Sequence, residues 1–355
     1  MCRIVWVYLI AVYLQSVSTY KHFNSTCSIA VFAAEGGFEA ISQSFVKLAE
    51  SVGVSFQTGK TATQIAKNGV HVRNSNTKND DKIADDSFVP ADLIIVNADL
   101  PYASMSLIAD SDDESTNDRK ESRYDWDPSY LYSSGVLAFH WSIDKELVDL
   151  KTHNVYLAAA SGRSQAEESW RLLRKGSQNT KNPTGVEPFN FYVHCPTKTD
   201  PSAAPEGCDS IMVLVPCPTL QRKKEFAKLP RDEAIAKYKE QFNEKVVTEM
   251  RQAVLDRFSV FDSLKDLKDH ILDEVVDTPG TYADSYNVAA GTPFALSHGF
   301  GQLSLTRPGM HSSESNNILY CGASSRPGNG VPLVLIGSKL VSKKAISVIK
   351  KLSTG

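Results

Sequence analysis

Several short motifs by which enzymes are recognised are absent from this sequence. The six cysteines include no C-x-x-C pair and the eight histidines no H-x-x-x-H pair, so neither a disulfide framework nor a metal site is predicted. There is no G-x-S-x-G elbow, which argues against a hydrolase. There is no P-loop either, and the two stretches that begin like G-x-G-x-x-G, at Gly299 and Gly328, carry Ser304 and Leu333 where the third glycine belongs.

A strong excess of charge of one sign is also absent. The 38 Lys and Arg residues nearly balance 41 Asp and Glu residues, and the net charge is −3, which gives no support to a nucleic-acid partner. The length of 355 residues and the 42% hydrophobic content are those of an ordinary globular chain with one large or two modest cores.

The N-terminus has no apolar run long enough to span a bilayer comfortably. Residues 4–14 are mostly apolar, follow Arg3 and precede small residues at 16–18, a pattern typical of a secretory signal peptide. The alternative interpretation is that residues 1–30 are the remnant of a truncated gene product.

The most informative stretch lies near the C-terminus. An apolar run at 318–321 ends in a loop with three glycines, Gly322, Gly328 and Gly330, and is followed by Val331, Pro332 and a second apolar run. This pattern predicts a buried strand, a loop with little side-chain bulk, and a helix with proline in its first turn. Such a loop presents bare backbone amides and a helix N-terminus, which suit a large, flat, anionic ligand such as a nucleotide cofactor. A tight connection without a ligand would have the same composition.

The remaining pattern predicts a discontinuous arrangement. Apolar spacing predicts a helix after Gly36-Gly37 that ends at Gly53, with Ile41, Phe45, Leu48 and Val52 on one face, and one long helix over 231–258. Strands are predicted at 54–56, 93–96, 132–141, 191–194 and 211–215, a hairpin turn at Asn68-Gly69, and polar surface segments at 74–87, 110–127 and 164–185. Residues up to about 100 and after about 300 would build one layered domain, and the middle would build a strand-rich second domain.

The order of motifs from residue 32 onward resembles the bacterial-type phytoene desaturases, which are flavin-dependent carotenoid and retinoid oxidoreductases related to the amine oxidases. The segment TDPSAAPEGCD, at 199–209, is the most specific match, and the others are individually weaker. The matching segments are AEGGFEAI (34–41), ADLIIVNADLP (91–101), YSSGVLAFHWSID (132–144), THNVYLA (152–158), PFNFYVHCPTKTDPSAAPEGCDSIMVLVPC (188–217) and YCGASSRPGNGVP (320–332).

This resemblance implies an α/β (α+β) fold, a two-domain flavoprotein of the glutathione-reductase-like type. An FAD-binding layered domain, here without its N-terminal βαβ unit, would be interrupted by a substrate domain with an antiparallel sheet and helices. The expected boundaries are 1–30 for the uncertain leader, 31–100 for the first part of the FAD domain, 101–300 for the substrate and membrane-associating domain, and 301–355 for the C-terminal part of the FAD domain.

The resemblance also implies an FAD-dependent enzyme that desaturates a phytoene-type polyene by hydride transfer to flavin, in carotenoid biosynthesis. Its partners would be the hydrophobic polyene and a membrane surface, with a plastid location if the source is a photosynthetic eukaryote. The alternatives are a carotenoid isomerase, a retinol-saturase-like flavoenzyme, or a truncated, non-catalytic remnant that binds flavin poorly.

By the same resemblance, nine residues border the flavin: Gly322, Ala323, Pro327, Gly328, Gly330, Val331, Pro332, Gly36 and Gly37. No catalytic residue is assigned, because a cofactor accepts the hydride. The group His140, Trp141 and His153 is a candidate for proton handling, with a structural role as the alternative. Four carboxylates have capping as their principal interpretation, namely Asp99, Asp200, Glu206 and Asp209. Four aromatic residues are candidate walls of an apolar tunnel or ordinary core residues, namely Tyr282, Tyr286, Phe294 and Phe300.

Overall fold

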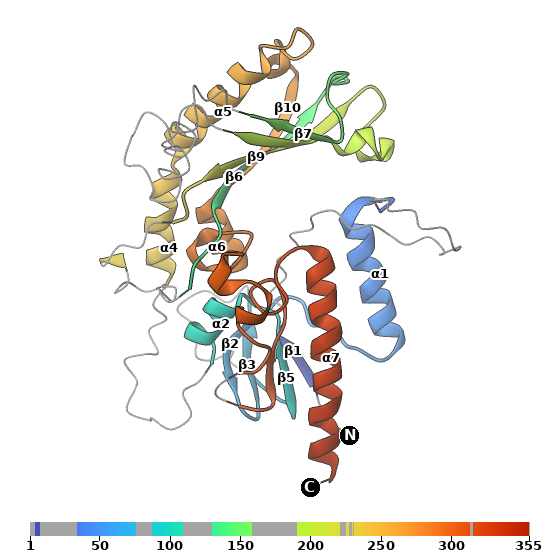
Figure 1. Cartoon of the computed structure of the whole chain (residues 1–355), viewed down its shortest axis with the longest axis vertical. Coiled ribbons are helices and arrows are strands. Elements are labelled where there is room, and N and C mark those ends of the chain that lie inside the picture. The colour runs from blue at the N-terminus through green and yellow to red at the C-terminus, as the bar shows by residue number, and fades with distance from the viewer. Residues whose placement is uncertain are drawn as a thin grey trace.

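Three β-sheets organise the chain in the computed structural model, which describes residues 4–7, 34–75, 87–108, 130–157, 190–220, 225–226, 229, 231–312 and 315–354. One sheet is parallel and two are antiparallel. With the helices that cover them they form a mixed α/β structure (Figure 1). The predicted polar segments lie mainly outside the described residues, as does most of the leader, and the predicted domain boundaries stay predictions.

The parallel sheet has β5 (Leu93–Val96) at its centre, between β1 (Ile4–Val7) and β11 (Ile318–Tyr320). All four residues of β5 are buried, because the strand is covered on both faces. Ile94 and Val96 pack towards the hairpin sheet and α2 (Leu100–Ser106), whereas Leu93 and Ile95 pack against the C-terminal helix α7 (Val331–Thr354). The continuous apolar strand and the helix after the glycines were both predicted correctly.

The hairpin sheet consists of β2 (Lys60–Ala66), β3 (Gly69–Asn74) and β4 (Ser87–Pro90). Its turn occupies Lys67 and Asn68, one residue earlier than predicted, because Gly69 already pairs with Ala66. The predicted strand at 54–56 is wrong, since those residues have no regular structure.

Helix α1 (Gly37–Ser51) forms where the apolar spacing predicts it, but it buries none of its residues. Phe45, Leu48 and Val52, which the pattern places on one apolar face, are 54%, 62% and 75% exposed. The apolar periodicity therefore predicted the helix correctly. Within the described residues, however, nothing buries the apolar face of this helix.

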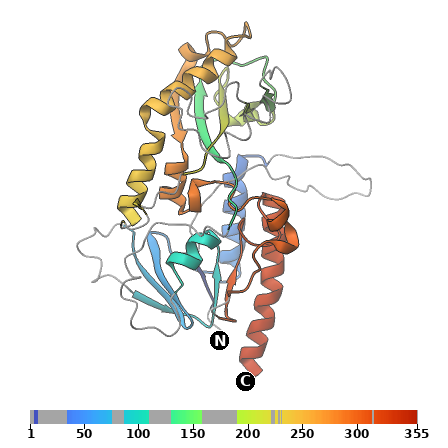
Figure 2. The ribbon, with the colours of Figure 1, turned by 60° about the vertical axis from the view of Figure 1, so that its left-hand side comes forward.

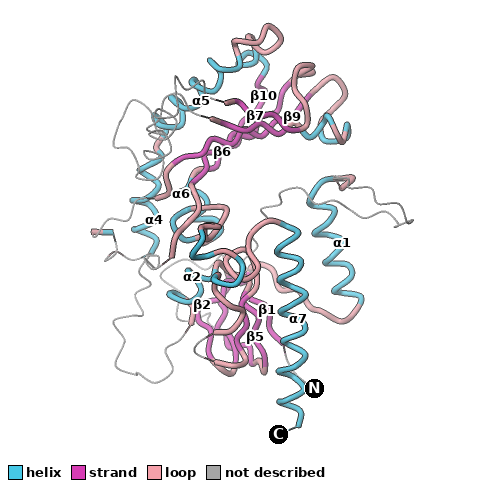
Figure 3. The backbone as a smooth tube through the Cα atoms, in the orientation of Figure 1, coloured by secondary structure: helices cyan, strands magenta, loops and turns pink. Residues whose placement is uncertain are grey.

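The five-stranded antiparallel sheet is made by the middle of the chain, in the order β10-β6-β9-β8-β7. Its strands are β6 (Gly135–Ile143), β7 (His153–Tyr156), β8 (Phe191–His194), β9 (Asp209–Cys217) and β10 (Ile271–Asp277). One face packs against α5 (Glu244–Phe258) in the largest core, which includes Trp141 and Phe258. In Figures 1 and 3, α5 runs along the outer side of this sheet, and the parallel sheet and α7 lie towards its other side.

The prediction of one helix over 231–258 is wrong. The chain forms α4 (Arg231–Lys239), a 3-10 turn (Glu240–Phe242) and then α5. Asn243 is extended at the break, and its side-chain oxygen accepts a hydrogen bond from the Val246 amide at 3.2 Å, which is the geometry of a helix N-cap. The break lets the apolar stripe serve two cores, because α4 packs with α6 (Pro279–Tyr286) and α5 packs on the sheet. Figure 2 shows the two helices, in yellow and orange, running one after the other along one side of the upper half of the molecule.

No helix within the described ranges combines the length and the apolarity needed to cross a membrane.

The buried carboxylate of Asp209 links the five-stranded antiparallel sheet to neighbouring loops. Asp209 at the start of β9 accepts hydrogen bonds from the Leu147 amide at 2.6 Å, from Lys198 Nζ at 2.8 Å and from the Thr197 hydroxyl. Burial opposes ionisation, but the hydrogen bonds from Lys198 and Thr197 outweigh it and hold the pKa of Asp209 below its ordinary value. Asp209 was predicted to be a capping group of a loop; instead it is the first residue of β9 and binds groups from two other segments of the chain.

Asp209→Asn should destabilise the fold by about 3 kcal/mol, because it leaves Lys198 and the Leu147 amide without their anionic partner. The free energy of unfolding in urea measures this effect. Glu240→Gln is the matched control, since it breaks a Lys237–Glu240 pair whose side chains are 50% and 66% exposed, and it should cost less than about 1 kcal/mol. Equal losses in the two variants would contradict the assigned role of Asp209.

Candidate functional site

The glycine loop, residues 322–330, connects β11 to α7. Its three glycines have positive φ angles of 101°, 145° and 92° at Gly322, Gly328 and Gly330, a region that other residues adopt only with strain. Ser324 and Ser325 are buried, whereas Gly330 is exposed. The loop therefore has an inner half held by the protein and an outer half at the surface.

The inner half packs closely against two side chains. A Cβ atom at Gly322 would lie 2.7 Å from Asn97 Oδ1, and one at Gly328 would lie 2.7 Å from His298 Nε2. Real Cβ atoms essentially never come this close, so a side chain at either position would have to displace the end of the Asn97 or His298 side chain, in addition to the strain of its positive φ. These two glycines do not need a cofactor to explain them.

The outer half is different. A Cβ atom at Gly330 would meet nothing within 4 Å, and Pro332 is exposed. The Val334 amide donates to the Gly330 carbonyl at 2.9 Å, so the amides of Val331 and Leu333 belong to the first turn of α7, where a helix has no internal acceptor for them. The start of a 24-residue helix thus has exposed positions at Gly330 and Pro332, which suits an anionic or flat ligand.

A buried arginine fixes the inner half of the loop. Arg307 Nη2 donates to the Ala323 carbonyl at 2.6 Å and to the Leu296 carbonyl at 2.9 Å, and Nη1 donates to the carbonyls of Ser297 and Gln302 at 3.1 and 3.3 Å. Its Nε is buried without a hydrogen-bond partner in the described structure. Burial lowers the pKa of Arg307, while the nearby Asp99 opposes this change.

Asp99, at the end of β5, takes part in the same junction. Its carboxylate accepts hydrogen bonds from the Ala289 amide at 2.9 Å and from the Ser324 hydroxyl of the loop. Asp99 stands at the N-cap position of α2, but no side-chain capping bond forms there, so its interpretation as a turn-capping carboxylate is wrong. Burial raises the pKa of Asp99, against the lowering effect of Ser324, Ala289 and Arg307.

The loop also contacts residues 294–298, through Asn329 to Phe294 and through Gly328 to His298. Asn329 Nδ2 donates to the Phe294 carbonyl at 2.8 Å, and Phe294 packs against Val136, Ala138 and Leu214 of the five-stranded sheet. Burial and the charge of Arg307 lower the pKa of His298, so its imidazole beside Gly328 is neutral at neutral pH.

The sheet face on which Phe294 packs lies opposite α5 and is called the second face here. One rung across all five strands places Val275, His140, Met212, His194 and His153 side by side. The next rung places Asp277, Ala138, Leu214, Tyr192 and Val155. The second face therefore mixes apolar and polar side chains, and three histidines lie along one rung.

The predicted group His140, Trp141 and His153 is divided by the sheet. Trp141 points into the core on the α5 side, where its Nε1 donates to Glu274 at 2.6 Å. His140 lies on the second face with Nε2 3.2 Å from Asp277, and His153 lies three strands away on the edge strand β7.

The structure keeps Gly36 and Gly37 at the start of α1, and the Gly36 amide donates to Asp200 at 3.3 Å. Asp200 also accepts from Ser202, as the predicted capping group. Tyr282 is buried and stacks on Tyr286 at 6.3 Å between ring centroids, whereas Phe300 is 98% exposed. Of the four aromatic residues, Phe294 packs against the second face.

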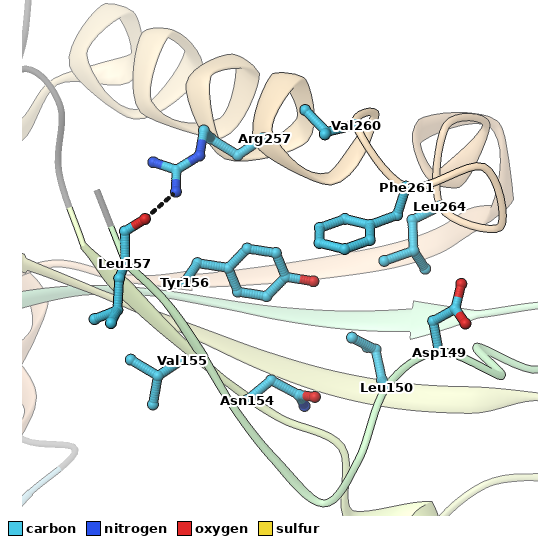
Figure 4. Close-up of a pocket in the computed structure, with 10 residues that line it drawn as sticks. All are labelled: Asp149, Leu150, Asn154, Val155, Tyr156, Leu157, Arg257, Val260, Phe261 and Leu264. Atoms are coloured by element: carbon cyan, nitrogen blue, oxygen red, sulfur yellow. Dashed lines mark hydrogen bonds between the residues drawn. The ribbon is translucent and has the colours of Figure 1, made fainter. Parts of the chain in front are cut away.

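A cavity of about 440 Å³ lies on the other side of the sheet, between β7 and the end of α5 (Figure 4). Tyr156, Phe261 and Leu264 line it, and Arg257 at its side donates to the Leu157 carbonyl at 3.0 Å. It lies on the α5 side of the sheet and does not include the glycine loop.

Sequence reasoning did not identify Arg307 or Asn329. The available signal was a single arginine in the otherwise uncharged stretch 299–312, but the carbonyls that it binds come from separate segments. Asn329 lies between Gly328 and Gly330, and the composition of this segment predicts only a turn.

The chain is a mixed α/β protein whose glycine loop precedes a long C-terminal helix, and its relatives are carotenoid desaturases. It is 28% identical to a phytoene desaturase of Fusarium fujikuroi over 88% of this chain and 50% of the relative. It is 29% identical to a zeta-carotene-forming phytoene desaturase of Myxococcus xanthus over 90% of this chain and 53% of the relative. The resemblance to phytoene desaturases is therefore confirmed, and the chain spans about half the length of the curated relatives it matches.

No protein-family model matches the chain. A crystal structure of an oxidoreductase from Methanosarcina mazei overlaps 87% of this chain and 55% of its own, with a TM-score of 0.49 and 16% identity.

Asp99→Asn should remove a pH-dependent contribution to stability. A carboxyl group whose pKa is raised by folding binds its proton more tightly in the folded state, so its contribution is fully present below its ordinary pKa of 3.8 and is lost as pH rises through the raised value. The unfolding free energy of the wild type minus that of the variant should fall across this window. Urea unfolding at a series of pH values tests this, and a constant difference would contradict it.

Proposed function

We propose that the chain is an FAD-dependent oxidoreductase that desaturates a phytoene-type polyene. The observation that carries the proposal is the pair of exposed positions Gly330 and Pro332 at the start of α7, with open space around Gly330, in a chain related to phytoene desaturases along most of its length. The proposed architecture is a two-domain flavoprotein of the glutathione-reductase-like type, with the five-stranded sheet in the substrate domain.

The residues present fit a flavin on the outer half of the loop only. The first-turn amides of Val331 and Leu333 and the positive end of α7 would face the cofactor, and Gly330 leaves room for a planar ring. When bound, FAD supplies the hydride acceptor that no amino-acid side chain provides. Gly322 and Gly328 act behind this outer half, where they let the loop approach Asn97 and His298.

The second face of the five-stranded sheet is the proposed binding surface for the polyene. Its apolar side chains exclude water from a hydrocarbon, and Phe294 connects this face with the loop residue Asn329. Removing hydrogen from neighbouring carbons also releases a proton. The neutral imidazole of His298, beside Gly328, is suited to accept it.

A membrane surface is the proposed source of the substrate, because a polyene dissolves in lipid. The tip of the middle domain carries exposed apolar side chains next to the cavity in Figure 4, including Val260 and Leu157, which are 78% and 70% exposed. Side chains of this kind would insert into the headgroup region.

Purified protein mixed with FAD and with phytoene in liposomes tests the activity. The expected products absorb at longer wavelength, because each new double bond extends the conjugated system. Geometric isomers of the substrate would support a carotenoid isomerase instead, and saturation of a retinoid would support a retinol-saturase-like enzyme. A folded protein that binds no FAD would overturn the proposal and favour a non-catalytic role.

Gly330→Ala should weaken FAD binding at least about tenfold, a loss of about 1.4 kcal/mol, because the added methyl group would occupy the space proposed for the ring. Gly53→Ala is the matched control, since Gly53 also has a positive φ of 89° and open space around its Cβ but follows α1. Both variants carry a similar backbone strain of about 1–2 kcal/mol. Fluorescence titration with FAD measures the difference, and equal affinities would contradict the assigned contact.

A further inference from the structure

The cavity in Figure 4 carries opposite charges on its two sides. Arg257 lies on one side and Asp149 on the other, and the ring of Tyr156 lies between them with its hydroxyl group towards Asp149. Burial and the charge of Asp149 raise the pKa of Tyr156 to about 12, while the charge of Arg257 lowers it. Both charges therefore act on the ring between them, and the cavity suits a ligand that is positive at one end and negative at the other.

Aromatic rings form a wall of the cavity near Asp149. Tyr156 and Phe261 both line it, with 5.9 Å between their ring centroids and 89° between their planes. Phe191 stacks on Tyr156 at 4.5 Å, and Phe258 meets Tyr156 edge-on at 5.1 Å, so this wall is anchored in the core of the sheet. Two perpendicular rings and a carboxylate suit a quaternary ammonium group, because such a cation is attracted to aromatic faces without needing a hydrogen bond.

The opposite side of the cavity suits the anionic end of the same ligand. Arg257 donates a hydrogen bond to the Leu157 carbonyl at 3.0 Å, and its guanidinium lies 5.6 Å from the centre of the Phe191 ring. A guanidinium has five N–H groups in a planar fork, which matches the oxygens of a phosphate. The volume of about 440 Å³ is that of an ordinary small-molecule site, which occupies about 300–1,000 Å³.

The rim of the cavity indicates the source of such a zwitterion. Val155, Leu157 and Val260 line the cavity and are largely exposed, as is the neighbouring Val148. Exposed aliphatic side chains insert into the boundary between lipid headgroups and acyl chains. A charged and aromatic cavity within such a rim therefore suits a headgroup that stays attached to its bilayer.

We propose that this cavity binds the phosphocholine headgroup of a phospholipid. The quaternary ammonium group lies against Tyr156, Phe261 and Asp149. The phosphate faces Arg257, and the rim enters the bilayer beside the bound lipid. The inference rests on the membrane contact of the proposed function, but it needs neither FAD nor a polyene.

Co-sedimentation of the whole chain with lipid vesicles tests this site. Phosphatidylcholine vesicles should bind the chain, and soluble phosphocholine should release it by filling the cavity. Phosphatidylglycerol vesicles should bind at least about fivefold more weakly, because their headgroup lacks the cation that pairs with the carboxylate. Equal affinity for the two lipids would overturn the proposal, as would binding that phosphocholine does not reduce.

Two charge variants separate the headgroup site from a general effect of charge. Asp149→Asn should weaken binding to phosphatidylcholine vesicles about fivefold. Asp262→Asn is the matched control, since it removes the same charge beside Phe261, but the Asp262 side chain is 104% exposed and does not line the cavity. The control should keep the wild-type affinity. Equal affinities in the two variants would overturn the proposal.

Val260→Ser tests the membrane contact by itself. Removing this exposed rim side chain should weaken binding to both kinds of vesicle and leave the affinity for soluble phosphocholine, measured by calorimetric titration, unchanged. If the wild type binds vesicles through Val260 but binds no phosphocholine, the headgroup site is overturned while the membrane contact stands. Absence of binding to either kind of vesicle would overturn both.

Discussion

The burial of the Arg307 guanidinium is the constraint on which the rest of the site depends. A buried cation is costly unless its hydrogen bonds are satisfied, and here four backbone carbonyls surround it, three between Leu296 and Gln302 and one from Ala323. The first three belong to the segment 296–302, which follows α6, and the fourth belongs to the glycine loop. One side chain thus fixes where the loop lies relative to the five-stranded sheet. Asp99 strengthens the same junction through Ser324 and Ala289.

The three glycines of the loop have two different roles: Gly322 and Gly328 pack against the protein, whereas Gly330 borders open space. The side chains of Asn97 and His298 approach Gly322 and Gly328 closely, so these two glycines have a packing explanation within the protein. No atom of the protein lies within 4 Å of a Cβ placed at Gly330. The missing side chain at this position therefore leaves room for a ligand rather than for a neighbouring residue. A closely packed base beneath an exposed helix start is the arrangement that holds a ligand accurately. The proposed cofactor therefore depends on Gly330 and the first turn of α7 more than on the glycine count.

Local patterns in the sequence were sufficient for elements whose cause is local. The continuous apolar run of β5 and the strand–loop–helix order around the glycines were predictable, because burial on both faces and missing side-chain bulk appear in consecutive residues. The break between α4 and α5 was not, because the apolar spacing continues through it and a single Asn243 cap decides it. Arg307 was missed for another reason. Its acceptors are backbone carbonyls, which leave no trace in the sequence.

Features created by strand pairing were the least visible. His153 and His194 belong to segments whose individual patterns suggest only half-buried strands, and neither pattern shows that the two residues will be neighbours. Antiparallel pairing of β7 with β8 aligns them, and pairing through β9 and β6 brings His140 onto the same rung. A shift of one residue in any of these pairings would turn a histidine to the α5 side. The register is held because Phe191, Val193, Ile211 and Val213 must face the core against α5, so the apolar packing on one face of the sheet determines which polar groups meet on the other.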